Sequence, residues 1–265
     1  DRPAFLSLNR GYSFYGKVVY RPSEDELYLQ AAKDADIVGR FTAFNALAGH
    51  EMLRLLEDPG AVVSSRFADL CAGLLADDAL MEEAGGQFLT IFPAVDDERF
   101  AHRYRALHDA KKKILAAVGA RHADTLLAVY RHAAVLRGGD GYLEDEARAI
   151  RRRQRKNTCL AILAARDAPE IHRLLAGQFR EAAAATDRLA AFGLILESSA
   201  PERLDILAEF CAASAKNPVA WESFLAVVAG SDCDDIVEIL RRIESSPAFS
   251  VEQAGEQAVG GRAVQ

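Results

Sequence analysis

The chain has 265 residues, of which 50% are hydrophobic and 27% are charged, and its formal net charge is −7. This composition is typical of a globular protein and excludes wholesale disorder. The acidic balance excludes a general attraction to nucleic acid or to an anionic membrane, and no apolar run approaches the roughly 18 residues needed to span a bilayer. We therefore expect neither nucleic acid nor a membrane as a partner.

The first 21 residues differ from the rest of the chain. Residues 14–20 are rich in aromatic and β-branched side chains, which favours a β-strand, and Arg21 and Pro22 interrupt it. Because the chain begins at Asp1 and not at Met, we expect it to be a piece of a longer protein.

From Ser23 onward the chain is rich in Ala, Leu, Glu and Arg, and its apolar residues follow a helical period. Ser23 and Glu26 have the spacing of a capping box, and Asn217 before Pro218 is a second capping signal. Similar signals predict further helix starts at three polar residues: Asp167, Ser199 and Ser231. Between these signals and the Gly and Pro breaks we expect about ten to twelve short helices.

None of the expected helices is long enough to bury its apolar stripe alone. Antiparallel pairs of helices, each covered by its neighbours, solve this problem. No strict repeat occurs at a fixed period. The sequence therefore predicts an all-α fold, an irregular α-superhelix of the HEAT/armadillo type, with a short β remnant at the N-terminus.

The cysteines give no sign of a metal site. They stand alone and far apart, without a CxxC pair, so we expect small buried core residues instead of zinc ligands. Reduced thiols favour a cytoplasmic location. The four residues are Cys71, Cys159, Cys211 and Cys233.

The segment from His50 to Arg54 begins like the zinc motif HExxH. That motif needs two histidines one helical turn apart, and Arg54 occupies the second position. A cation does not replace an imidazole ligand. We therefore expect residues 50–54 to lie on a helix surface, and we expect no metal ligand in this chain.

A basic run occupies residues 151–156 (Arg-Arg-Arg-Gln-Arg-Lys), shortly after the acidic residues 144–146. This pattern favours a solvated helix face with ion pairs inside the helix. The alternative is a lining for a cavity that meets anionic groups. The chain has no GxSxG, P-loop or GxGxxG motif, so we expect no catalytic residue in it.

Several segments carry a family resemblance in one consistent order. They include residues 7–13 (Ser-Leu-Asn-Arg-Gly-Tyr-Ser), residues 151–163 with Lys-Asn-Thr-Cys-Leu at 156–160, and residues 178–191 with Gln-Phe-Arg-Glu-Ala and Thr-Asp-Arg-Leu-Ala-Ala. Together they resemble the C-terminal part of bacterial-type aminopeptidase N, a family of zinc metallopeptidases.

The resemblance implies a domain plan and a role. Residues 1–21 would end a preceding small β-sandwich domain, and residues 22–265 would form the C-terminal helical domain, truncated at its end. In this family an upstream catalytic domain binds zinc and removes N-terminal amino acids from peptides. The resemblance implies that the helical domain is a non-catalytic lid, which covers the active site and restricts access to peptides.

Four residues are expected to face the enclosed cavity of the enzyme by resemblance: Gln178, Thr186, Asp187 and Glu256. The implied partners are the upstream catalytic and β domains and peptide substrates, with zinc in the catalytic domain, no cofactor in this chain and a monomeric state. Two other functions stay open. One is a free-standing α-solenoid scaffold for protein–protein interaction, and the other, less favoured, is a self-contained hydrolase.

Overall fold

The computed structural model describes residues 3–16, 19–92, 94–135 and 144–246. It divides the chain into two compact units, unit 1 (Asp1–Arg166) and unit 2 (Asp167–Gln265). Within the described residues it contains twelve α-helices, two short 3-10 helices and no β-strand. The predicted all-α fold and the predicted number of helices are therefore confirmed.

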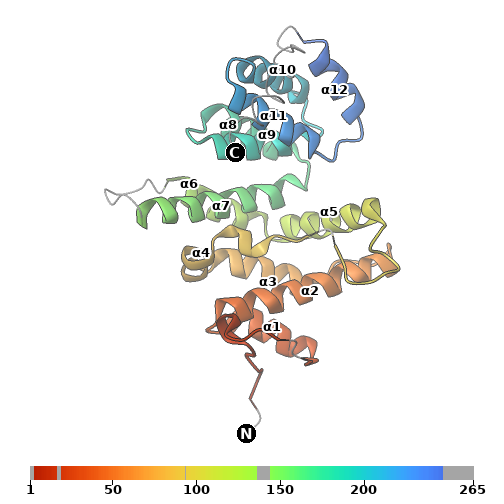
Figure 1. Cartoon of the computed structure of the whole chain (residues 1–265), viewed down its shortest axis with the longest axis vertical. Helices are drawn as coiled ribbons and strands as arrows, with labels where there is room; N and C mark the ends of the chain where they lie inside the picture. The colour runs from red at the N-terminus through yellow and green to blue at the C-terminus, as the bar shows by residue number, and fades with distance from the viewer. Residues whose placement is uncertain (1–2, 17–18, 93, 136–143, 247–265) are drawn as a thin grey trace. The chain divides into compact units, whose positions relative to one another are not determined.

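Unit 1 contains seven of these α-helices and both 3-10 helices (Figure 1). Consecutive helices pack against each other, as α1 does with α2 and α6 with α7. The elements are η1 (Arg10–Tyr12), α1 (Glu24–Lys33), α2 (Ile37–Glu57), α3 (Ser65–Ala76), α4 (Asp78–Ala84), η2 (Gly86–Leu89), α5 (Tyr104–Arg121), α6 (Ala123–Val135) and α7 (Glu144–Ala164).

Helix α7 is approached closely by the main chain on two sides, and both approaches occur at glycines. A Cβ atom on Gly86 would lie 2.5 Å from the carbonyl oxygen of Gln154, and one on Gly119 would lie 2.7 Å from that of Ile162. Real Cβ atoms do not come this close to another atom. Only glycine therefore lets η2 and α5 reach α7 at these distances.

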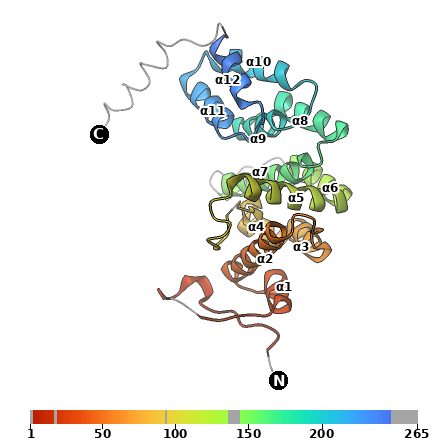
Figure 2. The same cartoon turned by 90° about the vertical axis from the view of Figure 1, so that its right-hand side faces the viewer.

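Unit 2 contains the remaining five helices (Figure 2). Helices α8 and α9 are in contact and are joined by three residues, so they must run antiparallel. The elements are α8 (Pro169–Glu181), α9 (Ala185–Leu196), α10 (Arg203–Ser214), α11 (Pro218–Ala229) and α12 (Ile236–Glu244).

The core of unit 2 is an aromatic cluster contributed by four helices. The ring of Phe192 on α9 lies 4.9 Å from that of Phe210 on α10 and 5.5 Å from that of Phe224 on α11. Phe179 of α8 and Trp221 of α11 extend the cluster on either side. Edge-to-face and tilted ring pairs at these distances add to the free energy gained by burying the rings.

Two of the predicted helix starts are confirmed in detail. The Ser23 hydroxyl accepts a hydrogen bond from the Glu26 amide, and the Glu26 carboxylate accepts one from the Ser23 amide, which completes the capping box. The Asn217 side chain accepts from the amides of Val219 and Ala220, with Pro218 at the first helical position.

The other three predicted capping positions are displaced by one to four residues, because their side chains bond elsewhere. Asp167 adopts a left-handed conformation with φ 47°, and α8 begins after Ala168 without a side-chain cap. Helix α10 begins at Arg203, four residues after Ser199. The Ser231 hydroxyl donates to the carbonyl of Val228 at the end of α11, and α12 begins only at Ile236.

The strand expected over residues 14–20 is absent from its described part, which excludes residues 17–18. Phe14 instead donates its amide to the Asn9 side chain in a local turn. A β-strand is stable only when a neighbouring strand pairs with its main chain. No strand among the described residues offers that pairing.

Candidate functional site

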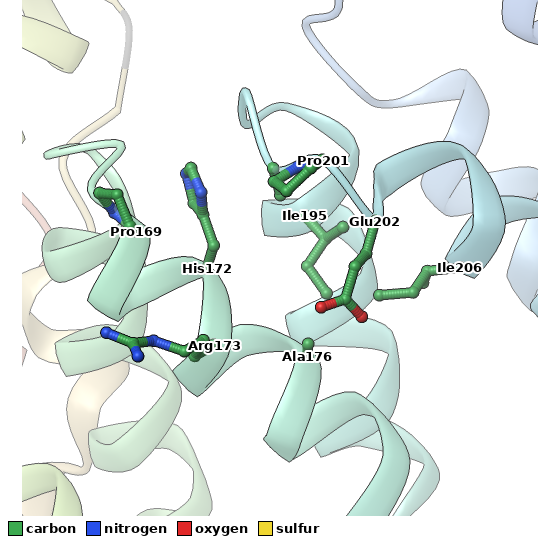
Figure 3. A pocket seen from close by; sticks show the side chains of 9 residues that line it. Pro169, His172, Arg173, Ala176, Ile195, Pro201, Glu202 and Ile206 are labelled. Carbon is green, nitrogen blue, oxygen red and sulfur yellow. The ribbon is translucent and has the colours of Figure 1, made fainter.

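A pocket of about 340 Å³ lies in unit 2 between α8, the end of α9 and the start of α10 (Figure 3). Its walls are mostly apolar, and the polar groups that line it come from His172, Arg173 and Glu202. The apolar lining consists of Pro169, Ala176, Ile195, Ala200, Pro201 and Ile206. A pocket of this kind accommodates an apolar group and orients it by a few charges.

His172, a lining residue, is held by an aspartate at the end of the preceding segment. Its Nε2 atom lies 2.7 Å from the Asp167 carboxylate, which also accepts a hydrogen bond of 2.9 Å from the Ser199 amide. Burial raises the pKa of Asp167, but the hydrogen bonds from Ser199 and His172 outweigh it and hold that pKa below its usual value. Asp167 therefore stays ionised and connects α8 to the segment that precedes α10.

These three residue types do not form a nucleophilic triad here. In such a triad the imidazole lies between the carboxylate and the hydroxyl, so that it can take the hydroxyl proton. The His172 ring and the Ser199 hydroxyl are instead both directed at the same Asp167 carboxylate. The arrangement stabilises the α9–α10 connection and offers no activated serine.

The charge of Glu202 at the pocket is already balanced. Its carboxylate lies 2.6 Å from the Arg180 guanidinium, and both side chains are about half exposed. This contact raises the pKa of Arg180. The pocket therefore offers no unpaired carboxylate at Glu202, and its lining is suited to binding a ligand.

Of the four residues expected to face a cavity, the three that the structure describes are not part of this pocket. Gln178 and Asp187 are buried, and the Gln178 side chain donates a 2.9 Å hydrogen bond to the Asp187 carbonyl oxygen, which joins α8 to α9. Thr186 is exposed, and Glu256 lies outside the described residues. Whether these residues face a cavity of a larger enzyme stays a prediction.

The HExxH-like segment lies in α2, and its glutamate is structural. His50 is exposed as expected, but Glu51 is buried, so the surface interpretation is wrong for that residue. The Glu51 carboxylate accepts hydrogen bonds from Arg54 (2.5 Å) and from the Ser64 amide (2.7 Å). It therefore links α2 to the start of α3.

The described residues provide no set of side chains that could bind a zinc ion. Nowhere among them do three His, Cys, Asp or Glu side chains gather closely enough to hold a metal. Cys71, Cys159 and Cys211 are buried and Cys233 is half-buried, which confirms the core role expected for the first three. Burial raises the pKa of Cys159 to about 12, so this thiol stays protonated.

The basic run of α7 is not uniformly solvated. Arg155 is buried and donates to the Leu75 carbonyl (2.8 Å) and to the Asp78 carboxylate (2.7 Å). The interpretation as a solvated face with ion pairs inside one helix is therefore wrong for Arg155, whose partners lie on α3 and α4. The side chains of residues 144 and 145 lie outside the described part of the chain.

Sequence reasoning missed the pocket because its lining comes from three segments that look ordinary in isolation. The signals at Asp167 and Ser199 predict only helix starts, and nothing in the sequence sets His172 apart. The available signal was the recurrence of an Asp or Ser before each proline, which marks two connections that meet at the Asp167 carboxylate.

Comparison with known proteins places the chain in context. Residues 24–254 match a family model described as a domain of unknown function (DUF3458_C) with ARM repeats. Legionella pneumophila aminopeptidase A, crystallised in complex with aspartic acid, is similar with a TM-score of 0.72 and 17% sequence identity. The match covers 94% of this chain and 30% of that chain, and at this identity it shows a shared fold alone. None of the described helices has the length and apolar character required to cross a membrane.

Proposed function

Because the chain belongs to the DUF3458_C family of ARM-repeat domains, we propose that it serves as the C-terminal helical domain of an aminopeptidase. The whole enzyme removes N-terminal amino acids from peptides in the cytoplasm. The observation that carries the proposal is the match of 94% of the chain to about a third of an aminopeptidase structure.

In this enzyme the domain is a non-catalytic lid. The upstream domain holds the zinc ion, since the described residues of this chain provide no ligand set for it. When bound there, zinc supplies an activated water and polarises the scissile carbonyl. This chain forms walls of the enclosed cavity. Its helix pairs are held rigid by cores such as the aromatic cluster of unit 2, so the walls exclude folded proteins and admit peptides.

The residues expected at the cavity then divide into two roles. Thr186 is exposed, and in this proposal its side chain contacts the peptide directly. Gln178 and Asp187 are buried and hold the start of α9, on which Thr186 lies, against α8. Glu256, which lies outside the described residues, stays a prediction for the same cavity.

The lid role is tested on the whole enzyme with two substrates that share one N-terminal sequence, a nine-residue peptide and a small folded protein. We expect the intact enzyme to trim the peptide and spare the folded protein. A variant that lacks residues 167–265 should trim both. An amino-acid amide serves as the control substrate, because its cleavage needs an intact catalytic domain and no lid. If the variant still cleaves the amide and spares the folded protein, residues 167–265 are not the barrier.

The chain alone separates the lid from a self-contained hydrolase. We expect no cleavage of amino-acid amides by the isolated chain with added zinc. Zinc-dependent turnover would overturn the proposal that the active site lies elsewhere. The scaffold alternative predicts that deleting residues 167–265 from the whole protein leaves its substrate range unchanged.

A further inference from the structure

Unit 1 contains a small hollow that the proposed lid function does not use. It has a volume of about 90 Å³ and lies between α4, α6 and α7. Four arginines of α7 line it, together with two acidic side chains of α4 and His132 of α6. The arginines are Arg148, Arg151, Arg152 and Arg155. From this lining we propose that the hollow binds a small oxyanion such as phosphate.

The first argument is an unsatisfied donor. The Nε atom of Arg151 is buried and has no hydrogen-bond acceptor among the residues that the structure describes. The backbone at Gly85 passes close to its side-chain stem, since a Cβ on Gly85 would lie 3.1 Å from the Arg151 Cγ atom. A buried donor without an acceptor destabilises a protein, more so when the group is charged. An anion in the hollow would offset the charge of this guanidinium, whose buried Nε has no acceptor of its own.

The second argument is the balance of charge. Arg155 is already paired with Asp78. Within the described part of the chain, no carboxylate lies within ion-pair distance of Arg148, Arg151 or Arg152. Glu82 is the one remaining acidic residue of the lining. The hollow therefore carries a surplus of positive charge that a bound anion would reduce.

The third argument concerns the class of ligand. Guanidinium groups present their N–H donors in a planar fork, which matches the paired oxygens of phosphate and carboxylate groups. A hollow of about 90 Å³ has room for such a group and not for a whole peptide. The shared chemistry is a small oxyanion, whether it is free phosphate or a carboxylate.

The test titrates the full chain with phosphate and, separately, with acetate, against chloride at constant ionic strength. Binding is followed by calorimetry. We expect saturable binding of phosphate and about tenfold weaker binding by Arg151→Gln, which loses charge-assisted hydrogen bonds to the anion. Tighter binding of acetate than of phosphate would identify the natural ligand as a carboxylate and would support the site equally.

Three variants keep the test specific. Arg153→Gln removes the same charge from the same run, but Arg153 does not line the hollow, so its affinity should match the wild type. Glu82→Gln should bind severalfold more tightly, because it removes a competing carboxylate. Arg151→Lys keeps the positive charge but lacks the planar guanidinium donors, and it controls for misfolding caused by loss of the charge. We expect a native circular dichroism spectrum and severalfold weaker binding for this variant.

Any of three results overturns the proposal. The wild-type chain binds neither anion saturably, Arg153→Gln weakens binding as much as Arg151→Gln, or Arg151→Lys binds as tightly as the wild type. The outcome is independent of the lid function, because it requires no catalytic domain.

Discussion

Substitution of Gly86 by alanine should destabilise unit 1, although the change adds only one methyl group. Gly86 begins η2 and faces the main chain of α7. The new Cβ would lie 2.5 Å from the Gln154 carbonyl oxygen and 2.6 Å from the Arg155 amide nitrogen, whereas ordinary contact begins at 3.4 Å. Both obstacles are main-chain atoms of a helix, so neither can rotate away.

The expected loss follows from this geometry. Overpacking a well-packed interior costs about 1–3 kcal/mol, and the upper end applies here because α7 and η2 must separate. The smaller conformational freedom of alanine in the unfolded chain returns about 0.4–1 kcal/mol. We therefore expect the free energy of unfolding of unit 1 to fall by about 2 kcal/mol.

Urea denaturation followed by circular dichroism at 222 nm measures this change. Trp221, the one tryptophan of the chain, lies in unit 2, so its fluorescence distinguishes the unfolding of that unit. The matched control is Gly49→Ala in the middle of α2, where no atom beyond the adjacent residues and the nearby helix backbone lies within 4 Å of the added Cβ. There alanine should stabilise the protein by about 0.5–1 kcal/mol, because glycine is a poor helix former.

The two glycines thus predict opposite signs for one chemical change. A Gly86→Ala variant as stable as the wild type would refute the reasoning, since it would show that η2 does not press on α7. A loss of stability at Gly49 as large as that at Gly86 would refute it as well.

Three further substitutions test the capping, the core and the ionised carboxylate. Ser23→Ala removes half of the capping box and should lower the free energy of unfolding by about 1 kcal/mol, read from the urea midpoint at 222 nm. Phe192→Ala should destabilise unit 2 by about 3–5 kcal/mol in the fluorescence-detected transition, whereas Phe92→Ala, at a ring that is 59% exposed, should change little. Since the pKa of Asp167 is lower in the folded state, its stabilisation is complete above the unfolded pKa of about 3.9 and is lost as the pH falls through the folded value. Asp167→Asn should therefore weaken the pH dependence of stability in that acid range, and an unchanged dependence would contradict the assignment.

The helices could be predicted because their signals are local. The Ser23–Glu26 and Asn217–Pro218 pairs act within one turn, so a sequence pattern contains the whole interaction. The family resemblance is confirmed by the ARM-repeat match and by the fold shared with an aminopeptidase. The false starts at Asp167 and Ser199 have the opposite cause, because these residues bond each other across 32 positions.

The roles of the candidate site residues were harder to predict, because they also depend on contacts between residues far apart in the sequence. In the basic run, the sequence does not distinguish Arg155 from its neighbours. Arg155 is buried between helices because its side chain donates a hydrogen bond to the Leu75 carbonyl on α3. Gln178 was singled out by resemblance, but its hydrogen bond to the Asp187 main chain depends on how α8 meets α9. Such roles are decided by tertiary packing, which no single segment encodes.

The glycine approaches to α7 impose an asymmetric constraint on sequence change. At Gly86 and Gly119 the identity of the residue is fixed, since any side chain would collide. Across each contact, Gln154 and Ile162 contribute main-chain oxygens, which every amino acid supplies. Their identities are therefore free with respect to these contacts. These two close approaches would leave no correlated substitutions, and methods that infer proximity from paired changes would overlook them.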